Sequence, residues 1–415
     1  MNFRIGLLSA SVALALSTVA RADDGIMWHG YLNVVGGVLQ DNPRSDDSDK
    51  KQHPGFINYD NTLTFDSQTS GALQATKTLD EKTLVTAQLY GEGRTNDYSA
   101  SLKWLYLTYN PSDNSTFRIG RIGAPFYYYT DFFNVGFAYH WIGLPTDVYR
   151  YDTTMTGIDY VYRNYFSDVE WSAEAFGGSA DITLVELDAE SKSRNDWGLS
   201  FIATKDSWLT GRISVVSAET SIYTDLISAS DILDDALAVV KDQYHLNDAL
   251  IASLKAGALP SLTEKLNLES KKAYYGDMYL KADLEKWLLV AESTYVDGGS
   301  YLGGSTFSIM GSVGYRIDNA MVYVSASNSH PMLSKEAKAD LSAPPSDLAA
   351  QIAPNIAAAF ASDARTTTVG VKFDTSTNTA VKFDVTGFEN KATLDSETMG
   401  VGKNVLVRAA LNASF

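Results

Sequence analysis

Apolar and polar residues alternate along many short segments of the chain. The alternation is clearest in residues 404–415, where one parity is entirely apolar: Val405, Val407, Ala409, Leu411, Ala413 and Phe415. A period of two places successive side chains on opposite faces of a β-strand. The same period occurs in residues 199–204, 307–316, 368–374 and 381–386. The pattern predicts β-strands that have one apolar face and one mostly polar face.

Short polar turns and long connections follow each other along the chain. The expected turns are 80–82, 110–114, 164–168, 205–206, 283–285, 318–319 and 375–378. The expected long connections are 41–55, 124–153, 179–194, 220–270, 297–304, 330–364 and 390–402. Short turns at one end and long loops at the other are typical of outer-membrane β-barrels.

The segments add up to about sixteen strands, an even number that suits a closed single-chain barrel. This count treats residues 58–79 as one long strand with a bulge at Ser70 and Gly71, and it changes if the segment forms two strands. A barrel of sixteen strands encloses an aqueous channel instead of a core filled with side chains.

Two of the long connections have helical spacing. Apolar residues recur with this spacing in residues 230–257, and Ser261 with Glu264 forms a capping-box pattern that predicts a further short helix. Residues 345–360 are alanine-rich and helix-like, with an interruption at Pro354. Two roles stay open for these helices: they decorate the outer rim, or they form a lid over the mouth of the barrel.

Residues 1–22 have the three parts of a secretory signal peptide. Arg4 gives a positive start, residues 5–19 carry no charge, and Ala20-Arg21-Ala22 is a small-residue cleavage site. The apolar part is too short, and its flanks are wrong, for the alternative of a membrane anchor. We therefore expect a signal peptide over 1–22 and a barrel domain over 23–415, with the mature chain beginning at Asp23.

The composition excludes several other classes of protein. Fifty acidic residues against 33 Lys and Arg give a net charge of −17, which argues against nucleic acid as a partner. There is no cysteine, so disulfides and thiolate chemistry are excluded. No run of 18 apolar residues follows the signal peptide, which excludes membrane-spanning helices. The 24 Tyr, 17 Phe and 7 Trp suit the aromatic girdles of an all-β, antiparallel transmembrane barrel.

One segment carries a family resemblance. Residues 117–149 read FRIGRIGAPFYYYTDFFNVGFAYHWIGLPTDVY. A strand with Arg-Ile-Gly-Arg, followed by Pro125 and a long aromatic loop, resembles the Gram-negative porin superfamily, and most of all gammaproteobacterial porins where the fifth strand enters the third loop. The signal peptide, the strand count and the terminal Phe415 extend this resemblance over the whole mature chain.

The resemblance implies a homotrimer in the outer membrane of a Gram-negative bacterium, in contact with lipid and lipopolysaccharide. It implies that the third loop, 124–153, folds into the barrel and narrows a water-filled channel for passive diffusion of small hydrophilic solutes and ions. The loop lacks the Pro-Glu-Phe-Gly-Gly-Asp tip of enterobacterial porins, which leaves the charge and width of the constriction open.

Charged residues on the predicted strands are expected to face the lumen, because Arg or Lys on the lipid face costs roughly 2–4 kcal/mol at mid-membrane. The candidates for the constriction flank the third loop or lie on it: Lys103, Arg118, Arg121, Arg163, Asp131 and Asp147. A basic wall opposite an acidic loop would produce a transverse field that orients polar solutes.

Some of these assignments have a second interpretation. Arg121 breaks the alternation of residues 117–119, so its alternative role is to pin the root of the loop. Two roles are also open for the three neighbouring tyrosines: they line the opening, or they pack beneath the loop. These residues are Tyr127, Tyr128 and Tyr129. Further charges are expected in the lumen, either functional or simply solvated on the wall: Arg212, Arg316, Lys372, Lys382, Arg408, Glu170, Glu174 and Glu292.

No sequence motif indicates catalysis or a cofactor. The chain has no H-E-x-x-H, no G-x-S-x-G and no phosphate-binding loop, so we expect no catalytic residue, no metal and no cofactor. Ser329 next to His330 is the single adjacent pair that an outer-membrane barrel enzyme would use. An acidic run lies in the first long connection, at Asp46, Asp47 and Asp49. Two interpretations are open for it: a solvated loop, or a site where divalent ions bridge these carboxylates to lipopolysaccharide.

The leading hypothesis is therefore a passive diffusion porin. The first alternative is a substrate-selective channel that is gated by the helical loops 220–270 and 330–364. Weaker alternatives are an outer-membrane barrel enzyme and a structural or adhesive barrel whose lumen is plugged.

Overall fold

The computed structural model describes residues 20–21, 25–40, 59–94, 97–150, 154–184, 189–224, 228–344, 346–359, 362–392 and 403–415. Most of the expected signal peptide, and the acidic run at 46–49, lie outside these residues. Within 1–22 only the two-residue strand β1 (Ala20–Arg21) is described, and it pairs with β2 at Met27 and Trp28.

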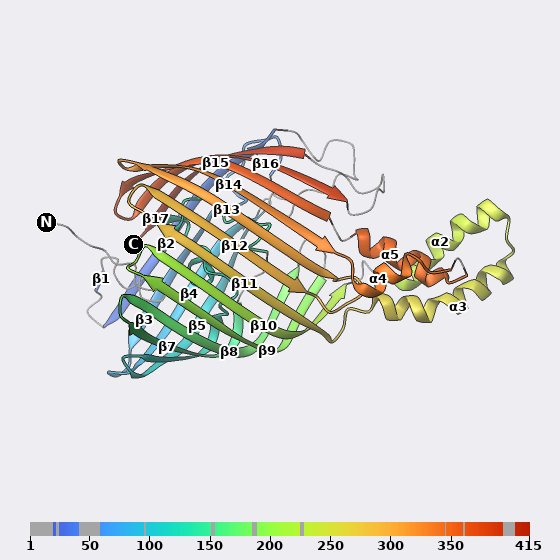
Figure 1. The fold of residues 1–415 in the computed structure, drawn as a ribbon, viewed down its shortest axis with the longest axis horizontal. Coiled ribbons are helices and arrows are strands. Elements are labelled where there is room, and N and C mark those ends of the chain that lie inside the picture. Colours follow the sequence, from blue (N-terminus) through green and yellow to red (C-terminus); the bar gives the residue numbers. More distant parts are fainter. Residues whose placement is uncertain are drawn as a thin grey trace.

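Sixteen antiparallel strands close into a barrel, as the alternation predicts (Figure 1). The first eight are β2 (Ile26–Leu39), β3 (Ser70–Thr78), β4 (Thr83–Arg94), β5 (Asp97–Ser112), β6 (Ser115–Gly123), β7 (Thr154–Phe166), β8 (Val169–Leu184) and β9 (Ala189–Lys205). The others are β10 (Leu209–Thr224), β11 (Lys271–Asp283), β12 (Trp287–Asp297), β13 (Ser305–Ile317), β14 (Ala320–Met332), β15 (Ser362–Ser376), β16 (Thr379–Ala392) and β17 (Lys403–Ser414). Each strand pairs with the next one, and β17 pairs with β2 to close the barrel.

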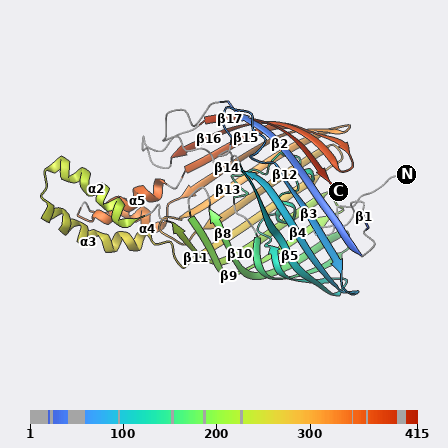
Figure 2. The ribbon, with the colours of Figure 1, turned by 180° about the vertical axis from the view of Figure 1, so that it is seen from behind.

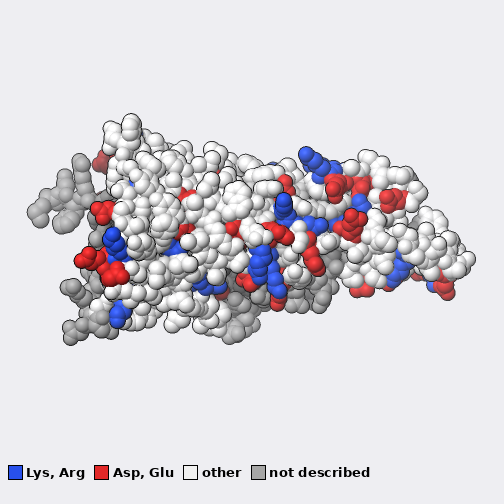
Figure 3. Space-filling view, turned by 90° about the horizontal axis from the view of Figure 1, so that it is seen from below, with Lys and Arg blue, Asp and Glu red and all other residues white. Residues whose placement is uncertain are grey.

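The two faces of the sheet differ as the period of two requires. On β13, Phe307, Ile309 and Val313 are exposed on the outside, whereas Ser308 and Ser312 are buried on the inside. Figure 3 shows one face of the molecule, on which a mostly uncharged stretch of the barrel lies between charged groups toward its two ends. An outward apolar belt is the surface that a hydrocarbon layer requires.

The expected long strand over residues 58–79 was wrong, because only Ser70–Thr78 forms a strand. Residues 59–69 leave the ladder and touch β2 at an isolated bridge between Gly37 and Thr64. The buried ring of Tyr59 packs directly against the backbone of Gly37. Any other residue at position 37 would clash, because its Cβ would lie 2.4 Å from the ring. The strand count is unaffected, because this segment adds no strand.

The turns lie where the sequence predicts them, but one long connection was misjudged. Residues 179–194 were expected to form a loop, whereas β8 continues to Leu184 and β9 begins at Ala189. The strands slip by a residue between Gly178 and Ala180, and polar residues then continue the sheet beyond the apolar belt.

Four helices extend from the loop end of the barrel, opposite the short turns (Figures 1 and 2). They are α2 (Ala229–Tyr244), α3 (Asp248–Leu266), α4 (Lys335–Asp340) and α5 (Leu348–Ala359), and we call them the helical arm. The arm has its own core, which includes Leu233, Leu237 and Leu262. Figure 1 shows that the arm points away from the barrel.

Two details of the helices differ from the expectation. No helix begins at Ser261, because α3 starts after its N-cap Asn247 and runs through Pro260 to Leu266. Pro354 does not interrupt the second segment either, since it lies inside α5. In the described part of the chain, no helix is long and apolar enough to cross a membrane.

Candidate functional site

The third loop lies inside the barrel. We call its described part, residues 124–150, the inner loop; it connects β6 to β7 and contains two short 3-10 helices, η3 (Thr130–Phe132) and η4 (Gly136–Ala138). Tyr127, Tyr129 and Trp141 are at most 5 % exposed and form an aromatic core with side chains of the barrel wall. Tyr129 meets Tyr279 of β11 edge to face, with ring centroids 5.9 Å apart. The loop is therefore packed against the wall like the core of a soluble domain.

The root of the inner loop is held by β10, β11 and β12. Arg212 donates to the backbone carbonyls of Pro125 and Phe126, and it pairs with Asp277 at 2.5 Å. Glu292 accepts from the Tyr128 N–H at 3.2 Å and from the Tyr149 hydroxyl. Two of the charges expected in the lumen thus hold the loop in place.

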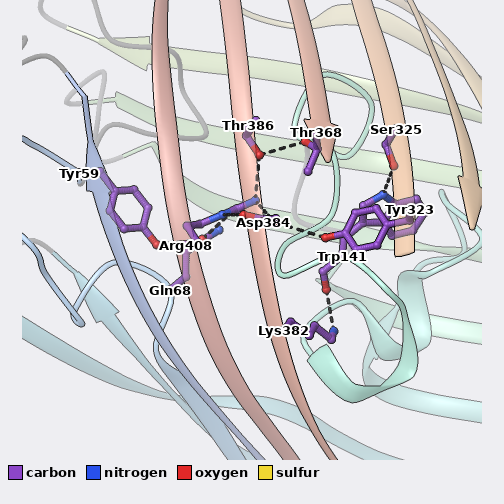
Figure 4. Close-up of polar contacts among 10 residues, drawn as sticks. All are labelled: Tyr59, Gln68, Trp141, Tyr323, Ser325, Thr368, Lys382, Asp384, Thr386 and Arg408. Atoms are coloured by element: carbon purple, nitrogen blue, oxygen red, sulfur yellow. Dashed lines mark hydrogen bonds and ion pairs between the residues drawn. The ribbon is translucent and has the colours of Figure 1, made fainter. Parts of the chain in front are cut away.

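The tip of the inner loop is held by a buried cation on β16, and Lys372 of β15 adds a hydrogen bond to the Phe137 carbonyl at 3.3 Å. The Lys382 ammonium donates to the carbonyls of Gly136 at 2.5 Å, Tyr139 at 2.8 Å and Trp141 at 2.6 Å, and the side chain is 0 % exposed. These three bonds use all three of its N–H donors. Figure 4 shows Lys382 beneath the segment that carries Trp141.

Serine side chains of β13 and β14 bind the middle of the loop. Ser312 forms a 2.8 Å hydrogen bond with His140, and Ser325 accepts from the Trp141 indole at 2.6 Å. Ser327 donates to Asp147 at 2.7 Å. No motif in the sequence pointed to these serines; the inward parity of their strands was the only available signal.

A second polar network fixes residues 59–69 against the wall (Figure 4). Arg408 of β17 makes two hydrogen bonds to Asp384 of β16, at 2.9 and 2.8 Å, and a third at 2.9 Å to Gln68. The Tyr59 hydroxyl also donates to Gln68 at 2.9 Å. Arg408 lies in the lumen as predicted, where it holds structure in place.

The inner loop makes its hydrogen bonds with one side of the barrel, from β10 through β17 to β2. Between the inner loop and the wall lies a cavity of about 840 Å³ that reaches toward the short-turn end, where Ser207, Asn378 and Phe415 line it. Its wall includes Arg163, Glu170 and Glu174 from β7 and β8.

Arg118 is the central charge on the wall of this cavity. Its guanidinium donates to Asp159 at 2.7 Å and to Glu174 at 3.1 Å, and it lies 4.0 Å from Asp131 of the inner loop. Asp131 is one-third exposed, and its side of η3 faces the wall. A basic wall residue therefore lies within ion-pair distance of an acidic residue of the inner loop, at the edge of the cavity.

The register of β6 corrects the placement of Arg121. Arg121 lies opposite Leu105 on β5 and Thr156 on β7, and both of these side chains are exposed on the outside of the barrel. Gly120, with a φ of +135°, lies between Arg121 and the lumen-facing Arg118 but does not change the parity. Arg121 therefore points outward and does not line the constriction.

Lys103 lies at a bulge of β5, the register shift between Gln88 and Leu89 of β4. Its ammonium lies over the rings of Tyr90 and Trp104, at 5.8 and 6.0 Å from their centroids. Because Tyr90 belongs to the inward face of β4, Lys103 also faces the lumen. It does not line the cavity at the short-turn end.

The three neighbouring tyrosines divide between the two alternatives. Tyr127 and Tyr129 are buried beneath the loop, whereas Tyr128 is half-buried and stacks on Tyr279 at 3.8 Å; all three contribute atoms to the wall of the cavity. Asp147 is 0 % exposed and lies behind the loop. It therefore cannot contribute its charge to the surface of a constriction.

The pair that an enzyme would use is separated by the strand. Ser329 is buried inside the barrel and bonds to Ser308 at 3.1 Å, whereas His330 is exposed outside and contacts Asp363 at 2.5 Å. Adjacent strand residues face opposite sides of a sheet, so these two side chains cannot act on one substrate. The buried contact between His140 and Ser312 is a loop anchor.

No protein-family model and no curated protein sequence matches this chain. Solved structures do match over nearly its whole length. The outer membrane channel DcaP of Acinetobacter baumannii shares 11 % identity, with a TM-score of 0.58, over 96 % of this chain and 100 % of its own. OmpF of Salmonella typhi shares 12 % identity, with a TM-score of 0.54, over 95 % and 99 % of the two chains.

A third matched structure is a porin that is described as anion-selective. The anion-selective porin from Comamonas acidovorans shares 13 % identity, with a TM-score of 0.52, over 94 % of this chain and 99 % of its own. At these identities the likeness concerns the fold. The chain has the same fold as these proteins, a closed porin-type β-barrel.

Proposed function

We propose that this protein is a porin that lets small hydrophilic solutes and ions diffuse passively across an outer membrane. The observation that carries the proposal is the cavity that remains beside the inner loop inside the barrel. The loop is fixed to the wall by hydrogen bonds from β10, β16 and β2, and charged and polar side chains line the space that it leaves free. A wide barrel that a packed loop narrows without plugging it is suited to sieving solutes by size and charge.

We propose that Arg118, Arg163, Lys103 and Asp131 form the charged part of the constriction. Arg118 and Asp131 lie 4.0 Å apart at the edge of the cavity, and Glu174 and Asp159 balance part of the Arg118 charge. Tyr128 adds an aromatic surface on the loop side. A field between a basic wall and an acidic loop orients polar solutes as they pass.

The location and assembly belong to the same proposal. We propose a cleaved signal peptide over residues 1–22, the short turns in the periplasm and the helical arm outside the cell. A homotrimer fits a matched outer membrane protein of Vibrio cholerae, OmpT, whose solved structure is described as a trimer form and has a TM-score of 0.51. The outward apolar belt would contact lipid, with lipopolysaccharide at the loop end.

The alternative of a gated channel finds no support in the position of the helices. The helical arm packs on its own core and points away from the barrel, so it does not form a lid in this structure. An enzymatic role lacks a paired nucleophile and base at Ser329 and His330, as their opposite faces show.

Liposome swelling tests the proposed function. Vesicles that contain the folded protein should swell in isotonic solutions of neutral sugars, with rates that fall steeply as the sugar becomes larger. Vesicles that contain heat-denatured protein are the control. Swelling rates equal to those of the control for all sugars, including the smallest, would contradict a diffusion channel.

A further inference from the structure

A buried lysine of β11 has no counter-ion at hydrogen-bond distance. Lys281 is only 9 % exposed, yet among the described residues it makes no hydrogen bond and no ion pair. Its nearest carboxylate along the same face, Asp283, is engaged by Arg316 at 2.7 Å. Burying an ammonium group without a partner is costly, so an unpaired lysine in a cavity wall indicates a place for an anion.

Two further cations line the same cavity beside Lys281. Arg316 of β13 and Lys372 of β15 lie in one hydrogen-bonded row, separated by Met321 of β14. Two strand spacings place their backbones roughly 10 Å apart. Lys372 is bound to Asp374 at 3.1 Å, so Arg316 and Lys372 are partly neutralised and Lys281 is not. Three cations and one shared carboxylate, Asp283, thus line this side of the cavity.

Aromatic rings of the inner loop face these cations. The Lys281 ammonium lies 5.9 Å from the centre of the Tyr128 ring, and Lys372 lies 4.7 Å from the centre of the Phe137 ring. Tyr128, Phe137 and the neighbouring Leu288 also line the cavity. Tyr128 is fixed in place by its stacking on Tyr279, with an angle of 4° between the rings. Each of these two lysines therefore has an aromatic ring of the inner loop beside it.

We propose that Lys281, with Arg316 and Lys372, forms a binding site for aromatic carboxylates on the short-turn side of the inner loop. The carboxylate would accept hydrogen bonds from Lys281, and the ring of the solute would pack against Tyr128 and Phe137. The site rests on the proposed channel. It would be a solute-binding site on the path between the constriction and the periplasm. Binding there must stay weak, because a channel site has to release its solute.

The acidic part of the cavity wall sets the specificity of this site. Glu170 and Glu174 of β8, three strands away from β11, line the same cavity, and so does Asp131 of the inner loop. A cation would be drawn to those carboxylates and an anion to the wall that carries Lys281. The chain's many exposed acids on the helical arm lie outside the barrel, so they do not cancel the local positive charge of this wall.

Calorimetric titration of the detergent-folded protein with benzoate tests the site directly. Saturable binding is expected for wild type. It should weaken about tenfold in Lys281→Met, which loses a charged hydrogen bond, and stay close to wild type in Lys281→Arg. Benzylammonium has the same ring with the opposite charge, and acetate has the charge without the ring; both should bind more weakly than benzoate. Lys286→Met is the matched control, because Lys286 is exposed on the adjoining short turn.

The same proteins in planar bilayers separate this proposal from the channel itself. Benzoate should reduce the single-channel current of wild type and Lys286→Met reversibly and saturably, and that of Lys281→Met only at about tenfold higher concentration. Wild-type affinity in folded Lys281→Met, or equal binding of benzoate and benzylammonium, would overturn the site while leaving the channel intact. A protein that binds benzoate but carries no current would overturn the channel and leave the site.

Discussion

The ammonium of Lys382 lies 2.6 Å from the backbone carbonyl of Trp141, although 241 residues separate the two in sequence. The same ammonium also binds the carbonyls of Gly136 and Tyr139, so one side chain fixes the tip of the inner loop to β16. In the proposed channel the loop sets the width of the opening, so Lys382 would control the geometry of the constriction without touching the solute.

Lys382→Met should loosen the tip of the inner loop. The substitution leaves three buried carbonyls without their donor, at a cost of roughly 1–3 kcal/mol for each buried group left unsatisfied. We expect faster amide hydrogen exchange in residues 134–142 and larger current fluctuations in the open channel. Lys403→Met on β17 is the control, since the Lys403 side chain is 72 % exposed. Unchanged exchange in residues 134–142 would show that the aromatic core alone holds the loop.

Arg118→Met should make the channel more selective for cations. Removing the guanidinium leaves Asp159, Glu174 and Asp131 without the positive charge that balances them. The reversal potential in a potassium chloride gradient should therefore shift toward the potassium equilibrium potential. Lys205→Met, at an exposed short turn, should leave it unchanged. A shift toward the chloride potential would refute the proposed constriction.

Arg121→Leu should leave conductance and ion selectivity as in wild type, because Arg121 points outward beside Leu105. An outward guanidinium is unfavourable in hydrocarbon, so the free energy of unfolding should rise, by at most roughly 2–4 kcal/mol. Denaturant titration in lipid vesicles measures this. A fall in stability would mean that a second subunit covers this face and that Arg121 binds to it.

Removal of the helices α2 and α3, with residues 228–267 replaced by a short Gly-Ser linker, should not alter the open-channel current. The arm points away from the barrel and has its own core, so the cavity and the inner loop keep all their contacts. Single-channel recordings of the shortened protein measure the effect. A marked increase in conductance, or loss of closing events, would support the gated channel.

The packing of the helical arm should weaken in acid. Partial burial by itself would raise the pKa of Asp340, but hydrogen bonds from Lys265, at 2.6 Å, and Tyr301, at 2.7 Å, outweigh this and lower it below 3.8. A lowered pKa in the folded arm means that Asp340 stabilises it above about pH 4 and that this contribution is lost as the pH falls through the lowered value.

Limited proteolysis of the arm between pH 3 and pH 7 measures this effect. Cleavage within α3 should accelerate at the acid end in wild type, and Asp340→Asn should be cleaved faster at neutral pH with little further change in acid. The same protection of wild type at all pH values would show that the Lys265–Asp340 pair does not contribute to the packing.

The strands were predictable because their period of two is a local property. Ser308 to Val313 shows the alternation directly in the sequence, and the structure places these residues inside and outside accordingly. The irregular segment 59–69 was missed because its bend depends on Gly37, which leaves room for Tyr59 on another part of the chain. Such a long-range contact leaves no periodic signal.

The lumen charges were predictable as a class but not in their roles. Parity along the strands places Arg212, Lys382 and Glu292 inside, and the structure agrees. Their function as anchors depends on which loop carbonyl or N–H lies opposite, 86 to 246 residues away in sequence. Arg121 was misplaced because its charge was given more weight than its parity: simple alternation from Phe117 and Ile119 already places it on the outward face.

The central claim is that the inner loop leaves an open, water-filled path through the barrel. Single-channel recording in planar bilayers tests it most directly. The account predicts stable steps whose current is proportional to voltage and to bulk salt conductivity, with closures in groups of three if the channel is a trimer. Folded protein that inserts into the bilayer and carries no current at any voltage would contradict it.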